Sequence, residues 1–201
     1  MRIEKPLSRR DRNLADIRER ATGVAERIVL SEGMEALSAR RLAKELGVSV
    51  GSLYNAFGDL DAVVRTVIAS SAVVLSDILS AAVEGAAPDR HARVVALGEA
   101  YFDFAIAEPE RWWLFFEYRS NVPNDLTARD FQAGLLEVLI RAGDGDPNSE
   151  RQRQFFLLLW ASVHGLVSLA CRRTIVAIDP DLARTYIGDL VDAGLNALTA
   201  D

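Results

Sequence analysis

The sequence predicts an all-α protein with an N-terminal helix-turn-helix domain followed by a larger helical bundle. Apolar residues recur at helical spacing along the chain, and the alternating apolar pattern of strands is absent. All six prolines avoid the interiors of these periodic segments, where a proline would break a helix. Near residue 47, a short turn with a glycine separates two short helical segments. These observations favour helices throughout, and 201 residues suffice for one full domain or two small ones.

The first three expected helices lie near residues 11–31, 38–45 and 49–57. The first has an apolar face at helical spacing, formed by Leu14, Ile17, Ala21, Val24 and Ile28. Ser38 and Ser49 are suited to cap the next two helices, because a serine hydroxyl accepts a hydrogen bond from an N–H of the first turn. Gly47 can take a left-handed conformation in the turn between them. Two short helices joined in this way form a helix-turn-helix.

The later expected helices lie near residues 59–84, 88–107, 109–119, 125–142, 147–173 and 180–199. Four of them begin at a proline, which is favourable in the first turn of a helix; these are Pro88, Pro109, Pro147 and Pro180. Asp146 and Asp179 directly precede two of these prolines and are expected to serve as N-caps.

Charge is distributed unevenly along the chain. The net charge is −6, yet residues 1–55 carry 11 Lys and Arg against 8 Asp and Glu, a net of +3. Residues 71–201 carry 11 against 19, a net of −8. A mildly basic head on an acidic protein suggests that the head, rather than the bundle, contacts a polyanion.

Several classes of site and protein are not expected. Cys171 is the only cysteine, which excludes an internal disulfide framework, and with His91 and His164 it gives too few ligands for a structural zinc site. We therefore expect no metal and no cofactor. The N-terminus lacks the apolar stretch of a signal peptide, so a cytoplasmic protein is expected. The longest uncharged run, residues 154–171, reaches only the lower limit for a membrane span, and its polar residues favour a buried helix.

The outer side of the third helix is suited to the major groove of DNA. With Leu53 and Phe57 assigned to the core, its outward residues are Val50, Gly51, Ser52, Tyr54 and Asn55. The small residues among them allow close approach, the tyrosine and asparagine offer polar groups, and the valine can touch a thymine methyl. On the second helix, Arg40, Arg41 and Lys44 can meet phosphates.

Residues 38–57, SARRLAKELGVSVGSLYNAF, resemble the DNA-binding signature of the tetracycline-repressor (TetR) family of bacterial regulators. The resemblance covers roughly residues 13–68. It implies a homodimer that binds a double-stranded DNA operator, and the residues expected to contact DNA are Ser38, Arg40, Arg41, Ser49, Val50, Gly51, Ser52, Tyr54 and Asn55. Two positions depart from the family pattern: a histidine is frequent at the place of Ala56, and a phosphate-binding lysine at the place of Leu60.

Eight of the fifteen aromatic residues lie between Tyr101 and Tyr118. Such a cluster fits either a well-filled core or the wall of an apolar ligand cavity. Residues 160–165 and 100–119 resemble the WHG class of TetR C-terminal domains, which implies a bundle that senses a small molecule. The candidate ligand-binding residues are Tyr101, Phe104, Phe115, Trp160 and His164.

His164 has three interpretations: a hydrogen-bonded core residue, a ligand contact or a catalytic group. No nucleophile or paired carboxylate is spaced to join it in catalysis. The sequence therefore does not predict an enzyme.

The helices at 147–173 and 180–199 are apolar around more of their circumference than packing on one core requires. The last helix also carries small residues that let another helix come close, namely Gly188, Ala193, Gly194 and Ala197. We expect these two helices to form a four-helix bundle across the twofold axis of a dimer, as the TetR resemblance also implies.

These patterns predict a DNA-binding domain over residues 1–58 and a ligand-binding and dimerisation domain over residues 59–201. The expected function is a TetR-like transcriptional repressor that binds a pseudo-palindromic operator and is released or modulated by a small apolar or amphipathic effector. The alternative is a small helical ligand-binding protein or enzyme with a vestigial DNA-binding head. A third interpretation is a ligand-independent dimeric DNA-binding protein whose bundle has no cavity.

Overall fold

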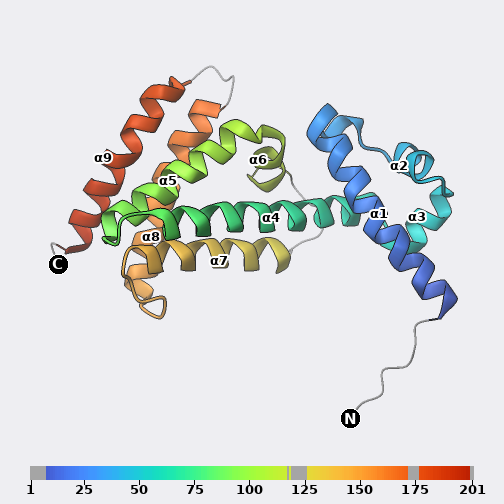
Figure 1. The fold of residues 1–201 in the computed structure, drawn as a ribbon, viewed down its shortest axis with the longest axis horizontal. Coiled ribbons are helices and arrows are strands. Elements are labelled where there is room, and N and C mark those ends of the chain that lie inside the picture. The colour runs from blue at the N-terminus through green and yellow to red at the C-terminus, as the bar shows by residue number, and fades with distance from the viewer. Residues whose placement is uncertain (1–7, 117, 119–125, 172–176, 200–201) are drawn as a thin grey trace, which may run out of the picture. The chain divides into compact units, whose positions relative to one another are not determined.

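The structure is a computed structural model that describes residues 8–116, 118, 126–171 and 177–199 (Figure 1). Its α-helices are α1 (Arg9–Glu32), α2 (Ala39–Leu46), α3 (Val50–Phe57), α4 (Leu60–Gly85), α5 (Arg90–Ala107), α6 (Pro109–Phe116), α7 (Leu126–Ala142), α8 (Glu150–Cys171) and α9 (Pro180–Thr199). One turn of 3-10 helix, η1 (Met34–Ala36), follows α1. No strand occurs among the described residues, and the all-α fold class predicted from the sequence is confirmed.

The start of α8 differs from the expectation. Asp146 does not cap this helix, which begins only at Glu150. The Ser149 hydroxyl accepts a hydrogen bond from the Gln152 N–H at 3.4 Å and occupies the capping position instead. Asp146 Oδ1 accepts from the Asn148 N–H at 2.9 Å, which forms a turn before the helix. The aspartate therefore shapes the turn, and the serine nearer the apolar run caps the helix.

The start of α9 follows the expectation. Asp179 Oδ1 accepts hydrogen bonds from the Asp181 N–H at 3.0 Å and the Leu182 N–H at 3.2 Å, so it caps the helix that begins at Pro180. Residues 117, 119, 125, 172 and 173, which the sequence places in helices, lie outside the described residues.

The chain divides into two compact units. The first comprises Met1–Ser71 with Trp113–Pro123, and the second comprises Ala72–Trp112 with Asn124–Asp201. The helix-turn-helix lies entirely in the first unit. The functional boundary expected at residue 58 stays a prediction, because compactness does not report which residues bind DNA.

The core of the first unit lies between α1, α2, α3 and the beginning of α4. Its buried side chains are Ala21, Ala25, Ile28, Val29, Leu37, Leu42, Leu46, Leu53, Val63, Val64, Val67 and Leu114. Leu114 of α6 and the half-buried Tyr118 come from much later in the chain. Arg18 Nε donates to the Ala56 carbonyl oxygen at 2.7 Å, and Arg20 Nη2 donates to the Leu46 carbonyl oxygen at 3.0 Å. Both arginines place a cation at the C-terminal end of a short helix, which is electrostatically favourable.

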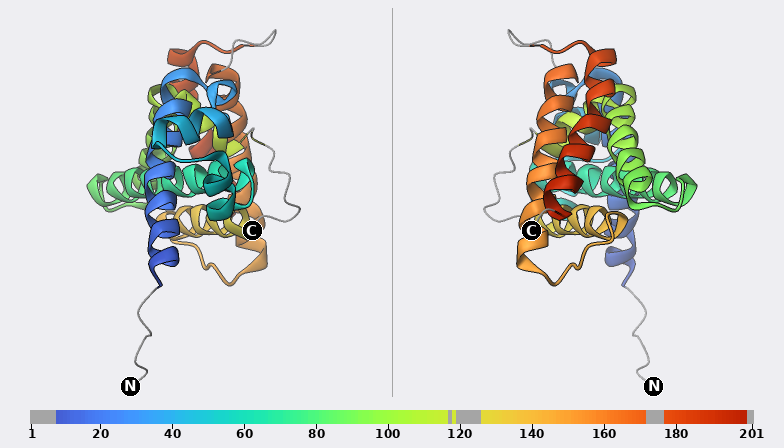
Figure 2. Two further views of the ribbon diagram at one scale, coloured as in Figure 1. Left: turned by 90° about the vertical axis from the view of Figure 1, so that its right-hand side faces the viewer. Right: turned by 90° about the vertical axis from the view of Figure 1, so that its left-hand side faces the viewer.

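In the second unit, α8 lies beside α9, and α5 also packs against α9 (Figure 2). Two glycines allow these close contacts. A Cβ atom on Gly98 would lie 2.6 Å from Ile187 Cγ2, and one on Gly194 would lie 2.9 Å from Leu159 Cδ1. Of the small residues on α9 that are expected to let another helix come close, Gly194 does so within the chain, where it faces α8.

Among the described helices, α4 and α8 are long and apolar enough to cross a membrane by length and composition. The core helix of a soluble bundle meets the same criteria. In α8, Phe156, Leu159, Val163 and Val167 are buried inside the second unit, and its other residues are half-buried or exposed.

Candidate DNA-binding and effector sites

The helix α3 is short but firmly placed. Gly47 precedes it with φ 68°, in the left-handed region that a glycine enters without steric cost. The Ser49 hydroxyl caps the helix by accepting a hydrogen bond from the Ser52 N–H at 3.0 Å. Within this helix, the Leu53 and Ala56 side chains are buried, and Phe57 is half-buried. The sequence assigned Leu53 and Phe57 to the core, and the structure adds Ala56 to them.

The five residues predicted to read DNA lie along this helix. Gly51 and Asn55 are exposed, Val50 and Ser52 are half-buried, and the Tyr54 side chain is 45% exposed. The Ser52 hydroxyl is hydrogen-bonded to the Ser49 hydroxyl at 2.9 Å. Tyr54 and Asn55 therefore offer the accessible side-chain donors and acceptors of α3, while Ser49 and Ser52 hold its first turn.

On α2, the predicted phosphate contacts differ in their surroundings. Arg41 is paired with two carboxylates: its guanidinium lies 2.5 Å from Glu32 Oε1 and 3.1 Å from Glu45 Oε1. These hydrogen bonds raise the pKa of Arg41 and lower the pKa of Glu32. The pKa of Glu45 is lowered first by a hydrogen bond from Arg27 and then by the one from Arg41. Arg40 is exposed and makes no ion pair with any described residue. A phosphate would meet Arg40 directly but would have to compete with two glutamates for Arg41.

Ser38 and Leu60 mark the beginnings of the two flanking helices. The exposed Ser38 hydroxyl caps α2 by accepting from the Arg41 N–H at 3.2 Å. Leu60 is the first residue of α4 and packs against the core of the first unit. At this position, where a lysine is frequent in the TetR family, Leu60 therefore contributes to packing and offers no positive charge to a phosphate.

A cavity of about 50 Å³ lies in the second unit, and we call it the Tyr101 cavity. Its wall is almost wholly apolar and comes from five helices, α4, α5, α7, α8 and α9. The lining residues are Leu79, Val94, Leu97, Gly98, Tyr101, Leu135, Leu139, Leu159, Trp160, Val163 and Val191. A cavity of this size is smaller than most ligand pockets, so an effector would have to widen it.

Two of the five predicted ligand-binding residues, Tyr101 and Trp160, line this cavity. Phe104 is 2% exposed and is buried elsewhere on α5. Phe115 belongs to the first unit, where its ring lies 5.8 Å from that of Phe116. His164 is not part of the lining either, although it contacts both residues that are.

A hydrogen-bonded aromatic cluster surrounds His164. The Tyr101 hydroxyl and His164 Nδ1 are 2.8 Å apart, and the Trp160 ring stacks on the imidazole with centroids 5.0 Å apart. The Trp112 ring lies 5.1 Å from the imidazole on centroids and 4.9 Å from the Tyr101 ring. This arrangement favours the interpretation of His164 as a hydrogen-bonded core residue.

The Tyr101 hydroxyl and His164 Nδ1 share one hydrogen bond, in which the imidazole tautomer decides which atom donates. Burial raises the pKa of Tyr101 well above its usual value and keeps this hydroxyl protonated.

The sequence did not single out the aliphatic part of the cavity wall. Leu79, Leu97 and Leu159 have the same spacing and residue type as ordinary core leucines, so no local signal distinguishes them. Among the described residues, no group of three or more His, Cys, Asp or Glu side chains is placed to hold a metal ion.

Comparison with protein families identifies both parts of the chain. Residues 22–67 match the family model of the bacterial regulatory proteins of the tetR family. Residues 94–192 match the family model of the tetracyclin repressor-like C-terminal domain. No functionally curated protein is similar to this chain at a significant level.

Solved structures show the same fold. A protein of unknown function from Rhodococcus sp. RHA1 is 26% identical, with a TM-score of 0.71, and the match covers 89% of this chain and 94% of that one. A TetR transcriptional regulator from Rhodococcus sp. RHA1 is 15% identical, with a TM-score of 0.69 and coverage of 92% and 99%. A TetR-family transcriptional regulator from Streptomyces coelicolor is 17% identical, with a TM-score of 0.65 and coverage of 90% and 98%.

The family matches cover the capped helix-turn-helix and most of the bundle that contains the Tyr101 cavity. The structural matches span nearly the whole chain. The protein is therefore a transcriptional regulator of the TetR family.

Proposed function

We propose that the protein is a homodimeric repressor that binds a pseudo-palindromic operator through α3 and is released by a small apolar effector. The outward face of α3 carries this proposal. It combines an exposed glycine, Gly51, with the accessible polar groups of Tyr54 and Asn55 on a helix that Ser49 caps. Small residues next to polar ones are suited to close approach and hydrogen bonding in the major groove.

We assign residues 1–58 to DNA binding and residues 59–201 to effector binding and dimerisation. Ser38, Arg40, Arg41, Ser49, Val50, Gly51, Ser52, Tyr54 and Asn55 are the proposed DNA contacts. A repressor of this kind acts where the genome is, which places it in the cytoplasm of a bacterium.

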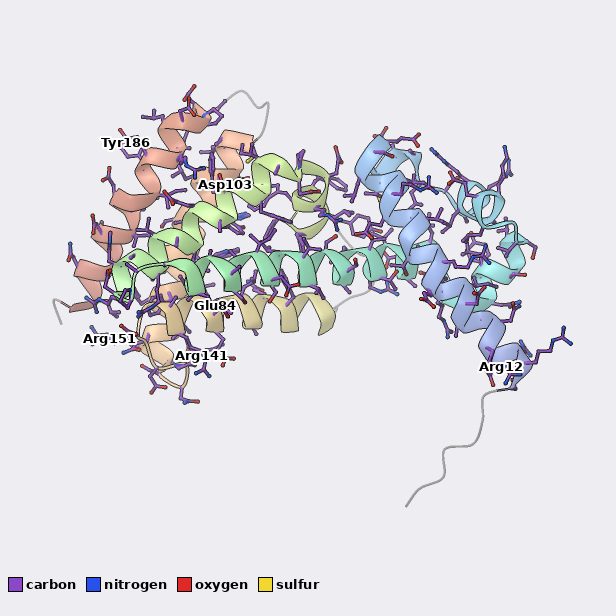
Figure 3. All side chains as sticks on the ribbon, in the orientation of Figure 1. Arg12, Glu84, Asp103, Arg141, Arg151 and Tyr186 are labelled. Carbon is purple, nitrogen blue, oxygen red and sulfur yellow. The ribbon has the colours of Figure 1, made fainter. Side chains whose placement is uncertain are left out.

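We assign the dimer interface to α8 and α9. Four large apolar residues are exposed on these helices: Leu157 at 39%, Leu158 at 68%, Leu182 at 48% and Tyr186 at 47%. Tyr186 is labelled on α9 in Figure 3. Exposed apolar side chains on two adjacent helices are typical of a self-complementary helical interface.

The effector site is the Tyr101 cavity, with Tyr101 and Trp160 in its wall. His164 lies outside the lining and contacts both of these residues. Phe104 and Phe115 are proposed to act indirectly, through packing. A ligand releases the operator only when it binds the released state more tightly than the DNA-bound state. The coupling is reciprocal, so operator DNA weakens effector binding by the same factor.

Footprinting of the purified protein on the DNA upstream of its own gene tests the DNA-binding proposal. A dimer with two heads should protect two half-sites with centres about 10 bp apart, or a small multiple of that spacing. Protection of a single asymmetric half-site would contradict the dimeric repressor. Absence of any protected site would favour a ligand-binding protein with a vestigial head.

A further inference from the structure

A second cavity adjoins the Tyr101 cavity. It has a volume of about 190 Å³ and is lined by Ser76 and Leu79 of α4 and by Phe131, Gly134, Leu135 and Val138 of α7. We call it the Ser76 cavity. Leu79 and Leu135 line both cavities. Because Ser76 and Gly134 are exposed, the Ser76 cavity opens to solvent, and the two shared leucines lie between it and the Tyr101 cavity.

The two cavities differ in the hydrogen bonds that they offer. In the Tyr101 cavity, the polar atoms of the described lining side chains belong to Tyr101 and Trp160; the Tyr101 hydroxyl is hydrogen-bonded to His164 Nδ1, and the Trp160 ring stacks on that imidazole. The Ser76 cavity has an exposed hydroxyl at its rim. A molecule that enters both would gain more by placing its polar end at Ser76 and its apolar end at Tyr101.

The charged residues in and next to the lining of the two cavities indicate which charge the ligand can carry. None of the described residues that line either cavity is acidic or basic, so a charged group inside would be desolvated without a partner among them. Two exposed carboxylates stand next in sequence to lining residues: Asp77 follows Ser76 on α4, and Glu137 precedes Val138 on α7. Glu137 is paired with Arg141 at 2.6 Å, so the negative charge of Asp77 is the one that disfavours an anionic head.

We propose that the effector is an elongated neutral amphiphile that enters between α4 and α7. Its apolar tail displaces Leu79 and Leu135 and fills the Tyr101 cavity, while its hydroxyl or carbonyl head stays beside Ser76. The inference rests on the proposed function and adds the route of entry, the orientation and the charge class of the effector. Displacing the two leucines joins the cavities, which explains how a cavity of about 50 Å³ can accept a ligand of ordinary size.

Brominated decanols test the orientation, because bromine quenches the fluorescence of a tryptophan that it touches. Decanol with bromine on its terminal carbon should quench Trp160 strongly at saturation, and decanol with bromine beside the hydroxyl-bearing carbon should quench it weakly. Trp113→Phe, which removes an exposed tryptophan that lines neither cavity, should leave the quenching unchanged. Stronger quenching by the bromine next to the head, or equal quenching by both, would overturn the proposed orientation.

A matched pair of glycine variants tests the entry route. A Cβ atom on Gly134 meets no atom within 4 Å, so the phenyl group of Gly134→Phe can occupy the Ser76 cavity without a backbone clash. Gly85→Phe is the control, since Gly85 also has open space around it but lines neither cavity. Gly134→Phe should lower decanol affinity by about tenfold or more relative to Gly85→Phe. Equal affinities of the two variants would exclude entry at Gly134.

Decanoate and decylamine test the charge class, because each keeps the ten-carbon chain and changes the head. Both should bind at least about tenfold more weakly than decanol. Equal or tighter binding of either would refute a neutral head.

Footprinting of the same preparation separates this inference from the proposed function. Operator protection without decanol binding would reject the ligand class alone, and decanol binding without operator protection would reject the repressor alone.

Discussion

At the scale of single residues, internal ion pairs modify the DNA contacts that the sequence predicts. Arg41 lies on the predicted phosphate-binding helix, but Glu32 and Glu45 hold its guanidinium. The sequence places these acids 9 residues before and 4 residues after Arg41, and only the fold brings Glu32 close. Residue type and helical position therefore predicted the cation, whereas its availability depends on tertiary structure.

Removing the carboxylate of Glu32 should release Arg41 for DNA. We expect Glu32→Gln to tighten operator binding and to steepen the slope of log K against log salt by about one unit per head, as one more phosphate contact would. Glu35→Gln is the control, because it removes the same charge from an exposed residue that is not paired with Arg41. Binding titrations over a series of salt concentrations measure both slopes. Identical slopes for the two variants would mean that removing the Glu32 carboxylate does not free Arg41 for phosphate.

A tyrosine in the first unit gives a pH-dependent prediction. The Tyr118 hydroxyl donates to Asp61 Oδ1 at 2.6 Å, and Asp61 is 8% exposed and paired with Arg65. Burial and the hydrogen bond to Asp61 raise the pKa of Tyr118 to about 12. The unfolded chain loses this proton near pH 10.0 while the folded chain keeps it, so the contribution to stability is present below pH 10.0 and is lost as the pH rises to about 12.

Tyr118→Phe should remove this pH dependence. Urea unfolding at pH values between about 9 and 12 should show the wild-type protein losing stability relative to the variant as the pH rises. The difference in tyrosinate absorbance between the two proteins should titrate with a midpoint near 12. A midpoint at the ordinary value for an exposed tyrosine would show that the hydroxyl does not bond Asp61.

At the scale of elements, the sequence predicted the helices and most of their ends. Ser49 and Asp179 were identified as caps because each directly precedes its helix, and local hydrogen bonds determine that position. The prediction that Asp146 caps α8 was wrong because two candidate caps, Asp146 and Ser149, precede the same helix and compete for its start. The small size of Gly194 indicated a close helix contact, but only the fold shows that α8 makes it.

The close contact between α5 and α9 requires a glycine at position 98. A Cβ atom there would lie 2.6 Å from Ile187 Cγ2, a methyl group on a β-branched side chain with little freedom to move. We expect Gly98→Ala to destabilise the protein by about 1–3 kcal/mol despite the better helix propensity of alanine. Gly85→Ala, where nothing lies within 4 Å, should be neutral or stabilising. Urea unfolding measures both, and an Ile187→Ala background should relieve the defect if the clash causes it.

At the scale of the whole molecule, the sequence predicted the fold class and the family because both depend on local patterns. The helix-turn-helix signature lies within 20 consecutive residues, 38–57, so it could be read directly. The Tyr101 cavity is lined by residues of five helices. No feature of the local sequence distinguishes its leucines and valines from other core residues. Aromatic clustering led to Tyr101 and Trp160, but it could not separate these from Phe104, which is buried elsewhere, or from Phe115, which belongs to the other unit.

The proposed dimer gives a prediction at the same scale. Leu158 is the most exposed of the large apolar residues on α8 and α9. A charge at the centre of an apolar interface is desolvated without a partner, so Leu158→Glu should convert the dimer to a monomer. Val73→Glu is the control, because Val73 is 60% exposed but lies on α4. Sedimentation velocity distinguishes the two, and a dimeric Leu158→Glu variant would place the interface elsewhere.

The contribution of Tyr54 to operator affinity tests the central claim, that α3 reads a specific DNA sequence. The measurement compares the wild-type protein with Tyr54→Ala on the footprinted operator and on an unrelated duplex at one salt concentration. Because Tyr54 is exposed on a helix held by Leu53 and Ala56, the variant should keep its circular dichroism and unfolding midpoint. We predict a loss of about 1–3 kcal/mol on the operator and no change on the unrelated duplex. Equal affinities of the two proteins for the operator, or equal losses on both duplexes, would contradict sequence reading by α3.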